Sequence, residues 1–119
     1  MSPKRGEIWL VNLDPTLGAE IKKTRPAIVV SSDVIGKLPL KLVVPLTDWK
    51  SAFGANLWHV YVEPSQDNGL TKISAADVLQ MRSVDTQRFV RKMGVLSDVD
   101  LTEVSIAIAL IVEYQESET

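Results

Sequence analysis

The chain has 119 residues, of which 45% are hydrophobic, so it can form one domain with a small core. It has no cysteine, which excludes disulfide bonds, thiol nucleophiles and zinc–cysteine sites. The net charge of −2 is unevenly distributed: residues 1–95 carry all 13 Lys and Arg against 9 acidic residues, whereas residues 96–119 carry 6 acidic residues and no base. A basic body can attract phosphate groups, although ordinary surface charge explains the same distribution equally well.

The first half of the chain contains three stretches with the composition of β-strands. Glu7–Leu13 is rich in Ile, Leu, Trp and Val and stops at Asp14-Pro15, a strong turn signal. Pro26–Ser31 is a β-branched run, and a proline is tolerated at a strand start because it need not donate to the ladder. Leu42–Leu46 is the third stretch, and its Pro45 predicts an edge strand or a bulge.

The second half continues with strand patterns before it changes character. Asn56–Val62 alternates as a half-buried strand does, with Trp58, Val60 and Val62 on one face. Lys72–Val84 is predicted to hold one or two further strands, and Ser83–Phe89 a short helical turn. The fold class expected from these elements is a small barrel of partly antiparallel strands.

The C-terminal region predicts a helix over Asp98–Tyr114. Ser97 is a suitable N-cap, acidic residues occupy the first turn, and apolar residues follow at helical spacing. Ile106 and Leu110 extend the apolar surface to a second flank, which fits either a dimer interface or a helix deeply buried in its own domain. The chain is therefore expected to be a single domain over 1–119, with a core of about residues 5–114 and a frayed acidic tail at 115–119.

The residue types of the chain do not favour a metal site or a cofactor site. His59 is the single histidine, no pair of ligands has metal-binding spacing, and the glycines are scattered, so we expect no metal and no cofactor. His59 lies in a strand pattern, where a structural or exposed histidine is favoured over a catalytic one. No apolar run is long enough to cross a bilayer, and we expect a soluble, cytoplasmic protein without membrane contact.

Phosphate chemistry is the remaining candidate. Arg25 stands at the start of a strand, two residues after Lys22-Lys23, where its guanidinium can hold a phosphate with two hydrogen bonds. RNA supplies its own nucleophile, the 2′-hydroxyl, so orienting it and stabilising charge on the phosphate suffices for cleavage. Thr47 is placed to donate a hydrogen bond to the same phosphate, whereas a surface ion pair between Arg25 and Glu20 is the simpler alternative.

Longer motifs give a more specific indication. The segment LDPTLGAEIKKTRPAIVVS (residues 13–31) resembles the signature of the MazF/PemK family, the toxin halves of bacterial toxin–antitoxin pairs. Thr47 after VVPL, His59-Val60, and the run LQMRSVD (residues 79–85) match further parts of the family pattern in order. The resemblance covers about residues 5–114.

The resemblance implies an SH3-like small barrel with a C-terminal helix, assembled as a homodimer. It implies a sequence-specific, metal-independent endoribonuclease that cuts single-stranded RNA, with Arg25 and Thr47 as the catalytic pair. Ile21-Lys22-Lys23 departs from the pattern and makes the loop more apolar and more basic. The residues expected to contact RNA are Glu20, Lys22, Lys23, Ser74, Gln80 and Arg82.

The resemblance also implies a partner and two alternative functions. The partner is a cognate acidic antitoxin protein, largely unfolded near the toxin, and the pair is expected to bind DNA and to control growth arrest. The first alternative is a gyrase poison of the same fold that binds through the helix at 98–114 and performs no chemistry. The second is a module that binds RNA or antitoxin without cutting.

Overall fold

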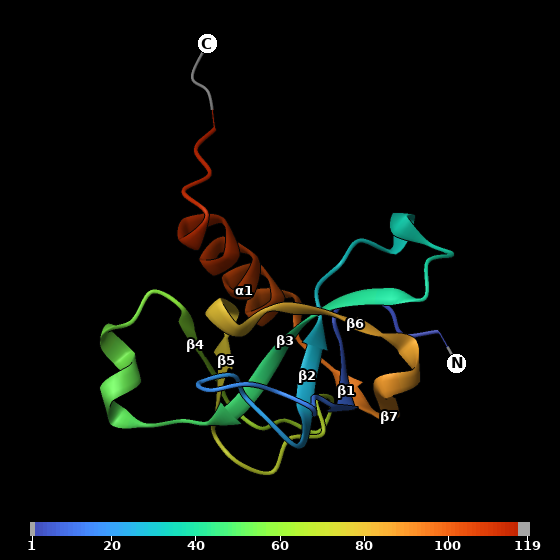
Figure 1. Ribbon diagram of the computed structural model, residues 1–119. Helices are drawn as coiled ribbons and strands as arrows, with labels where there is room; N and C mark the ends of the chain where they lie inside the picture. Colours follow the sequence, from blue (N-terminus) through green and yellow to red (C-terminus); the bar gives the residue numbers. More distant parts are fainter. Residues whose placement is uncertain (1, 117–119) are drawn as a thin grey trace.

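The computed structural model describes residues 2–116 and consists of one antiparallel β-sheet and one long helix (Figure 1). The seven strands follow the order β4-β5-β3-β2-β1-β7, with β6 also paired to β3. The prediction of a mainly β fold closed by a C-terminal helix is confirmed. The elements are β1 (Glu7–Asn12), β2 (Thr24–Val29), β3 (Leu40–Asp48), β4 (His59–Val62), β5 (Ser74–Asp77), β6 (Arg82–Asp85), β7 (Phe89–Val95) and α1 (Asp98–Ile111).

Strand β3 is the centre of the sheet and pairs with three other strands. Its first half pairs with β6 up to Val43, its last residues pair with β5 from Leu46 onward, and its other edge pairs with β2. Pro45 lies between the β6 and β5 pairings, where a missing N–H interrupts neither ladder. The prediction of an edge strand or a bulge at Pro45 is therefore wrong. The pairing with β2 continues without a register shift from Val43 to Pro45.

Several boundaries and one strand differ from the sequence-based expectation. Residues 72–84 contain two strands, β5 and β6, separated by the 3-10 turn η3 (Val78–Gln80), and the predicted helical turn after them is η4 (Thr86–Arg88). A further turn, η2 (Ser51–Ala55), precedes β4, which therefore begins only at His59. β7 was not predicted, because it is an edge strand with mostly exposed and partly charged residues and gives no apolar alternation.

β7 is held to β1 by an ion pair as well as by its ladder. Lys92 Nζ lies 2.9 Å from Glu7 Oε2, and the indole Nε1 of Trp9 donates to Glu7 Oε1 at 3.0 Å. Burial tends to raise the pKa of Glu7, but the hydrogen bonds from Lys92, from the Lys4 amide and from Trp9 lower it overall from its ordinary value of 4.5. The charged carboxylate is thus the form that joins the two strands.

The core is divided between the two faces of the sheet. Ile8 and Ile28 face one cluster, which the helix residues Val104 and Ala107 complete, whereas Trp9 and its neighbours face the other cluster. This division follows from the alternation of side chains along each strand. Residues on both faces of β1, β2 and the second half of β3 are therefore buried.

Helix α1 begins as predicted and ends earlier. The Ser97 hydroxyl caps it by accepting a hydrogen bond from the Asp100 amide, and the last helical residue is Ile111 rather than Tyr114. Ile106 and Leu110 are 49% and 50% exposed, so no other part of residues 2–116 covers the second apolar flank. Among residues 2–116, no helix has the length and apolarity needed to cross a membrane. The predicted tail reaches residues 117–119, which lie outside the described residues.

Candidate active site

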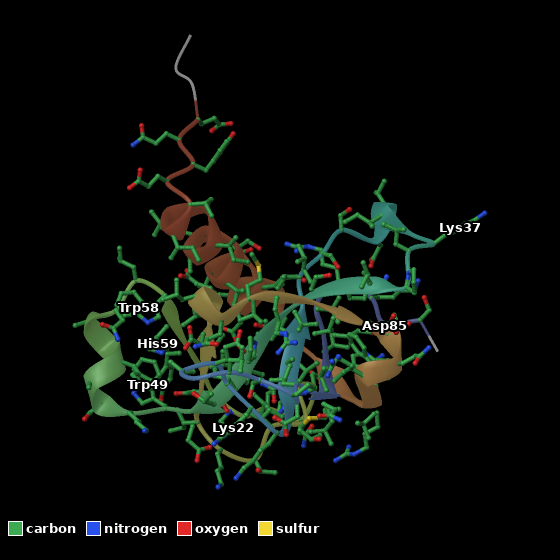
Figure 2. The ribbon with its side chains drawn as sticks, in the orientation of Figure 1. Lys22, Lys37, Trp49, Trp58, His59 and Asp85 are labelled. Atoms are coloured by element: carbon green, nitrogen blue, oxygen red, sulfur yellow. The ribbon has the colours of Figure 1, made fainter. Side chains whose placement is uncertain are left out.

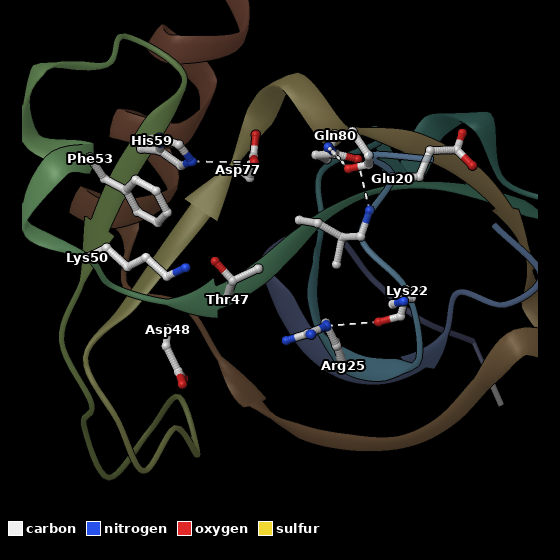
Figure 3. A pocket seen from close by; sticks show the side chains of 12 residues that line it. Glu20, Lys22, Arg25, Thr47, Asp48, Lys50, Phe53, His59, Asp77 and Gln80 are labelled. Atoms are coloured by element: carbon white, nitrogen blue, oxygen red, sulfur yellow. Dashed lines mark hydrogen bonds and ion pairs between the residues drawn. The ribbon is translucent and has the colours of Figure 1, made fainter. Parts of the chain in front are cut away.

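An open pocket of about 580 Å³ lies beside the ends of the central strands. The β1–β2 loop (residues 13–23), the ends of β2 and β3, the η2 turn and the facing ends of β4 and β5 surround it (Figure 3). Thr47 and Asp77 reach the pocket, while the residues next to them, Leu46 and Ala76, are buried in the core. The alternation of the strands thus separates the pocket face from the core face.

Adjacent strands bring Arg25 and Thr47 to the same pocket. Arg25 is the second residue of β2 and Thr47 the last but one of β3, and the paired register of these strands ends two residues away, at Ala27 opposite Pro45. Both side chains are half-buried, and both line the pocket. Residues 22 positions apart in the chain therefore form one wall (Figure 3).

The guanidinium of Arg25 is braced by the main chain rather than neutralised. Its Nε donates to the Lys22 carbonyl at 2.8 Å. The alternative ion pair with Glu20 is not formed, because Glu20 Oε1 accepts a hydrogen bond from the Leu17 amide at 2.7 Å. Among residues 2–116, no carboxylate lies within ion-pair distance of Arg25. Its positive charge remains available to an anion in the pocket.

Gln80 fastens the β1–β2 loop to the sheet. Its Oε1 accepts from the Ile21 amide at 3.2 Å, and its Nε2 donates to the Ala19 carbonyl at 3.1 Å. Asp14 closes the other end of the loop by accepting from the amide of Lys23, which has a φ of 73°. The loop therefore has a defined shape in which its side chains are positioned before any ligand binds.

The remaining predicted residues fall into two groups. Glu20, Lys22 and Gln80 line the pocket, whereas Lys23 is exposed outside it. Arg82 donates to the Leu13 carbonyl at 3.0 Å and supports the start of the loop from behind.

Ser74 is buried, and its hydroxyl donates to the Lys72 carbonyl at 3.0 Å. It lines a smaller neighbouring cavity that Arg25 and Thr47 also border. The predicted set is thus distributed around the pocket rather than gathered at one point.

Replacing Gln80 with alanine should loosen the loop without unfolding the protein. Each lost hydrogen bond is worth about 1 kcal/mol, so the amide of Ile21 should exchange with solvent about fivefold faster if one bond counts and about thirtyfold faster if both do. Hydrogen–deuterium exchange over residues 17–22 of the free protein measures this directly. Gln87→Ala is the control, because its exposed side chain makes no hydrogen bond within residues 2–116. Equal exchange in the two variants would show that Gln80 does not hold the loop.

Sequence reasoning missed Lys50, Asp77 and Phe53, which also line the pocket. The Lys50 ammonium points towards the Thr47 hydroxyl and adds a third cation to Arg25 and Lys22 (Figure 3). Lys50 and Phe53 lie in the connection from β3 to β4 and Asp77 ends β5, and none of them stands in a recognised motif, so only the fold could place them beside Arg25. The apolar-to-charged run WKSAF (residues 49–53) was the one available signal.

His59 is a structural part of the pocket wall. It lies directly opposite Asp77 in the β4–β5 register, and its Nε2 is 3.4 Å from Asp77 Oδ2. Its Nδ1 lies 3.1 Å from the Asn56 amide nitrogen. Its side chain is 7% exposed, which agrees with the interpretation of a structural histidine.

The pocket presents a hydroxyl with a cation on each side of it, and its lining also includes the carboxylates of Glu20, Asp48 and Asp77. Arg25 and Lys50 supply positive charge, and Thr47 supplies a hydroxyl between them (Figure 3). Within residues 2–116, no three His, Asp or Glu side chains gather in a way that could hold a metal ion. The arrangement can bind a phosphate and stabilise additional charge on it.

Comparisons with known proteins place this geometry in a family. The sequence profile described as "PemK-like, MazF-like toxin of type II toxin-antitoxin system" matches residues 4–112. Endoribonuclease MazF9 of Mycobacterium tuberculosis is 34% identical over 117 residues, covering 90% of this chain and 93% of its own length. Endoribonuclease MazF of Staphylococcus saprophyticus is 30% identical over 105 residues, covering 88% and 87%.

Solved structures agree on the fold. MazF from Deinococcus radiodurans has a TM-score of 0.77 at 20% identity and covers 96% of this chain and 99% of its own. An endoribonuclease from a mycobacterial species, solved in complex with its cognate antitoxin, has a TM-score of 0.75 at 15% identity and covers 98% and 100%. The profile match spans most of the chain, so the chain belongs to the PemK-like, MazF-like toxins of type II toxin–antitoxin systems.

Proposed function

We propose that this toxin is a sequence-specific, metal-independent endoribonuclease that cleaves single-stranded RNA. The observation that carries the proposal is that Arg25 and Thr47, from the adjacent strands β2 and β3, line one open pocket. Two relatives that align over most of the chain are named endoribonucleases, which supports the same reaction. The chemistry needs no group beyond those that the chain and RNA provide.

In the proposed reaction, the 2′-hydroxyl of RNA attacks the adjacent phosphorus and the 5′-oxygen leaves. The products are a 2′,3′-cyclic phosphate and a 5′-hydroxyl, with one proton lost from the 2′-oxygen and one gained by the 5′-oxygen. Arg25 neutralises the charge that develops on the phosphate oxygens, and Thr47 donates a hydrogen bond to one of them. Because arginine stays protonated, its role is electrostatic rather than that of a base.

The surrounding residues bind and position the RNA in this proposal. Lys22 and Lys23 contact the backbone, and Glu20 lies on the loop that borders the groove. Gln80 and Arg82 act through the loop that they hold, with Gln80 also facing the pocket, and Ser74 supports the floor between Thr47 and the strand β5. Base preference is assigned to the loop segment 20–23, because base edges of unpaired RNA are read by few contacts.

The test is cleavage of a single-stranded RNA transcript by purified protein in the presence of a strong chelator. We expect cutting at a limited set of sites with 2′,3′-cyclic phosphate ends, unaffected by the chelator. Mapping the ends across a transcript pool gives the recognition sequence. Intact RNA together with arrested DNA supercoiling would instead support a gyrase poison, and intact RNA that is nonetheless bound would support a binding module.

The antitoxin partner is also part of the proposal. A mycobacterial neighbour was solved with its cognate antitoxin, and neighbouring Deinococcus radiodurans structures contain MazE with MazF. The basic excess of residues 1–95 complements an acidic, largely unfolded antitoxin segment. Such a segment would occupy the same cations that RNA needs.

A homodimer accounts for the uncovered flank of α1. Ile106 and Leu110 are half exposed there, and a shallow pocket of about 460 Å³ runs between Arg5 and Ile106. Exposed apolar surface of this kind is typical of subunit contacts. Sedimentation velocity should give twice the 13.1 kDa chain mass for the wild type and a monomer for Ile106→Asp. A wild-type monomer at micromolar concentration would reject the dimer.

A further inference from the structure

An aromatic cluster stands beside the pocket and is formed by residues of the β3–β4 connection and of β4 itself. The rings of Phe53 and His59 are stacked, with centroids 3.8 Å apart and planes inclined by 12°. Trp49 contacts Phe53 edge-on at 5.9 Å and Tyr61 edge-on at 5.0 Å. Figure 2 shows Trp49 and His59 on the same side of the molecule, around the η2 turn. Four aromatic side chains thus form one cluster at the edge of the candidate site.

The cluster is held in a fixed orientation by polar contacts. His59 is restrained at both ring nitrogens, by Asn56 on one side and by Asp77 on the other. Because His59 is almost fully buried, its ring serves as a backing for Phe53 rather than as a contact surface. Phe53 is half-buried and lines the pocket, so part of its ring is accessible there. A ring that is braced from behind is pre-organised for stacking.

The charges around Phe53 indicate what would stack on it. Lys50 lies three residues earlier and lines the same pocket, with its ammonium between Phe53 and Thr47 (Figure 3). An aromatic face beside cations can bind single-stranded nucleic acid, where bases stack and phosphates pair with positive charge. The same pocket also carries the carboxylates of Asp48 and Asp77, so the phosphate contacts are assigned to Lys50 and Arg25 alone. Lys50 and Arg25 lie on the two sides of Thr47, which suits two successive phosphates of one strand.

We propose that Phe53, backed by His59, stacks a nucleobase of single-stranded RNA next to the phosphate held by Arg25 and Thr47. The inference rests on the proposed endoribonuclease function and adds a subsite to it, with Lys50 contacting the phosphate of the stacked nucleotide. A π-face binds every base, so the subsite contributes affinity and position more than sequence preference.

Binding measurements on an uncleavable RNA separate this subsite from catalysis. The probe is a fluorescent single-stranded oligonucleotide carrying the mapped cleavage sequence with 2′-O-methyl groups throughout, which removes every nucleophile. Phe53→Leu keeps apolar volume and removes the π-face, and it should bind about tenfold to hundredfold more weakly than the wild type. Phe53→Tyr should bind as the wild type does. Thermal unfolding identifies any variant that fails to fold.

Two further measurements distinguish stacking from general packing. Removing the base at one position near the cleavage site should strongly reduce the affinity of the wild type for the oligonucleotide. The same abasic change should reduce the affinity of Phe53→Leu only slightly, because the stacking contact is already lost in that variant. The salt dependence should be unchanged in Phe53→Leu and shallower by about one unit of slope in Lys50→Ala.

The outcomes keep the two proposals separate. If Phe53→Leu binds the oligonucleotide as tightly as the wild type while the wild type cleaves RNA, the stacking subsite is rejected and the nuclease stands. A protein-binding role for the cluster would give this same unchanged RNA affinity. If the wild type does not cleave RNA, the nuclease is rejected; binding is then measured on a mixed-sequence 2′-O-methyl oligonucleotide, where weaker binding by Phe53→Leu than by the wild type supports the stacking subsite and equal binding rejects it.

Discussion

Arg25→Ala should reduce the rate of RNA cleavage by about a thousandfold while leaving the fold intact. The side chain is half-buried, and its hydrogen bond within the described residues goes to the Lys22 carbonyl, so its removal creates no buried unpaired charge. What is lost is the positive charge that Arg25 places in the pocket that Thr47 also lines. Single-turnover cleavage of a labelled oligonucleotide measures the effect, and the apparent affinity should fall much less than the rate.

The matched control is Arg91→Ala, which removes the same charge from an exposed position on the edge strand β7. Its cleavage rate should stay within about twofold of the wild type at moderate salt, because distant surface charges are screened. Arg25→Lys is informative as well. It keeps the charge but not the two-pronged geometry, and we expect a rate between those of the wild type and the alanine variant. Equal rates for Arg25→Ala and Arg91→Ala would remove Arg25 from the mechanism.

Gly94→Ala should destabilise the protein by more than about 3 kcal/mol. A Cβ at this position would lie 2.3 Å from the Asp67 carbonyl oxygen and 2.6 Å from the Asn68 carbonyl carbon, and both atoms are main chain. They cannot move aside easily, because the Val95 amide donates to the same Asp67 carbonyl at 2.7 Å and Asn68 is buried. Thermal unfolding should show a midpoint lower by roughly 10 °C or more.

Gly54→Ala is the control for this effect. A Cβ on Gly54 would meet Trp49 at 4.0 Å, an ordinary van der Waals distance, so its stability should change by less than about 0.5 kcal/mol. A midpoint for Gly94→Ala within a degree of that for Gly54→Ala would mean that the loop at 67–69 can move away from β7.

The elements that sequence predicted well are those whose own pattern matches their burial. Glu7–Leu13 became β1 because its alternate residues face the two core clusters, and Ser97 caps α1 because a hydroxyl there satisfies the first turn. β7 escaped prediction because an edge strand has no core-facing alternation to detect. The prediction of an edge strand or bulge at Pro45 was wrong for a different reason. Whether a missing N–H interrupts a ladder depends on which strand lies beside the proline, and the sheet topology decides that.

The site divides in the same way. Arg25, Thr47 and Gln80 could be named from the sequence because they stand in ordered motifs that resemble a family. Lys50, Phe53 and Asp77 could not, since they reach the pocket through a turn and a cross-strand pairing that no linear spacing encodes. The hydrogen bond between the Gln80 side chain and the loop could not be predicted from the sequence either, because it joins residues 59 positions apart.

The fastening of the β1–β2 loop has a thermodynamic consequence for RNA association. Gln80, Asp14 and Arg25 each bond the loop main chain in the free protein, so its conformational entropy is lost on folding. RNA then meets a surface that needs little further ordering, and calorimetry should show a smaller unfavourable entropy for the wild type than for Gln80→Ala. Gln80, which lies far from the loop in sequence, thereby reduces the entropy cost of RNA binding, and more of the free energy of the RNA contacts contributes to affinity.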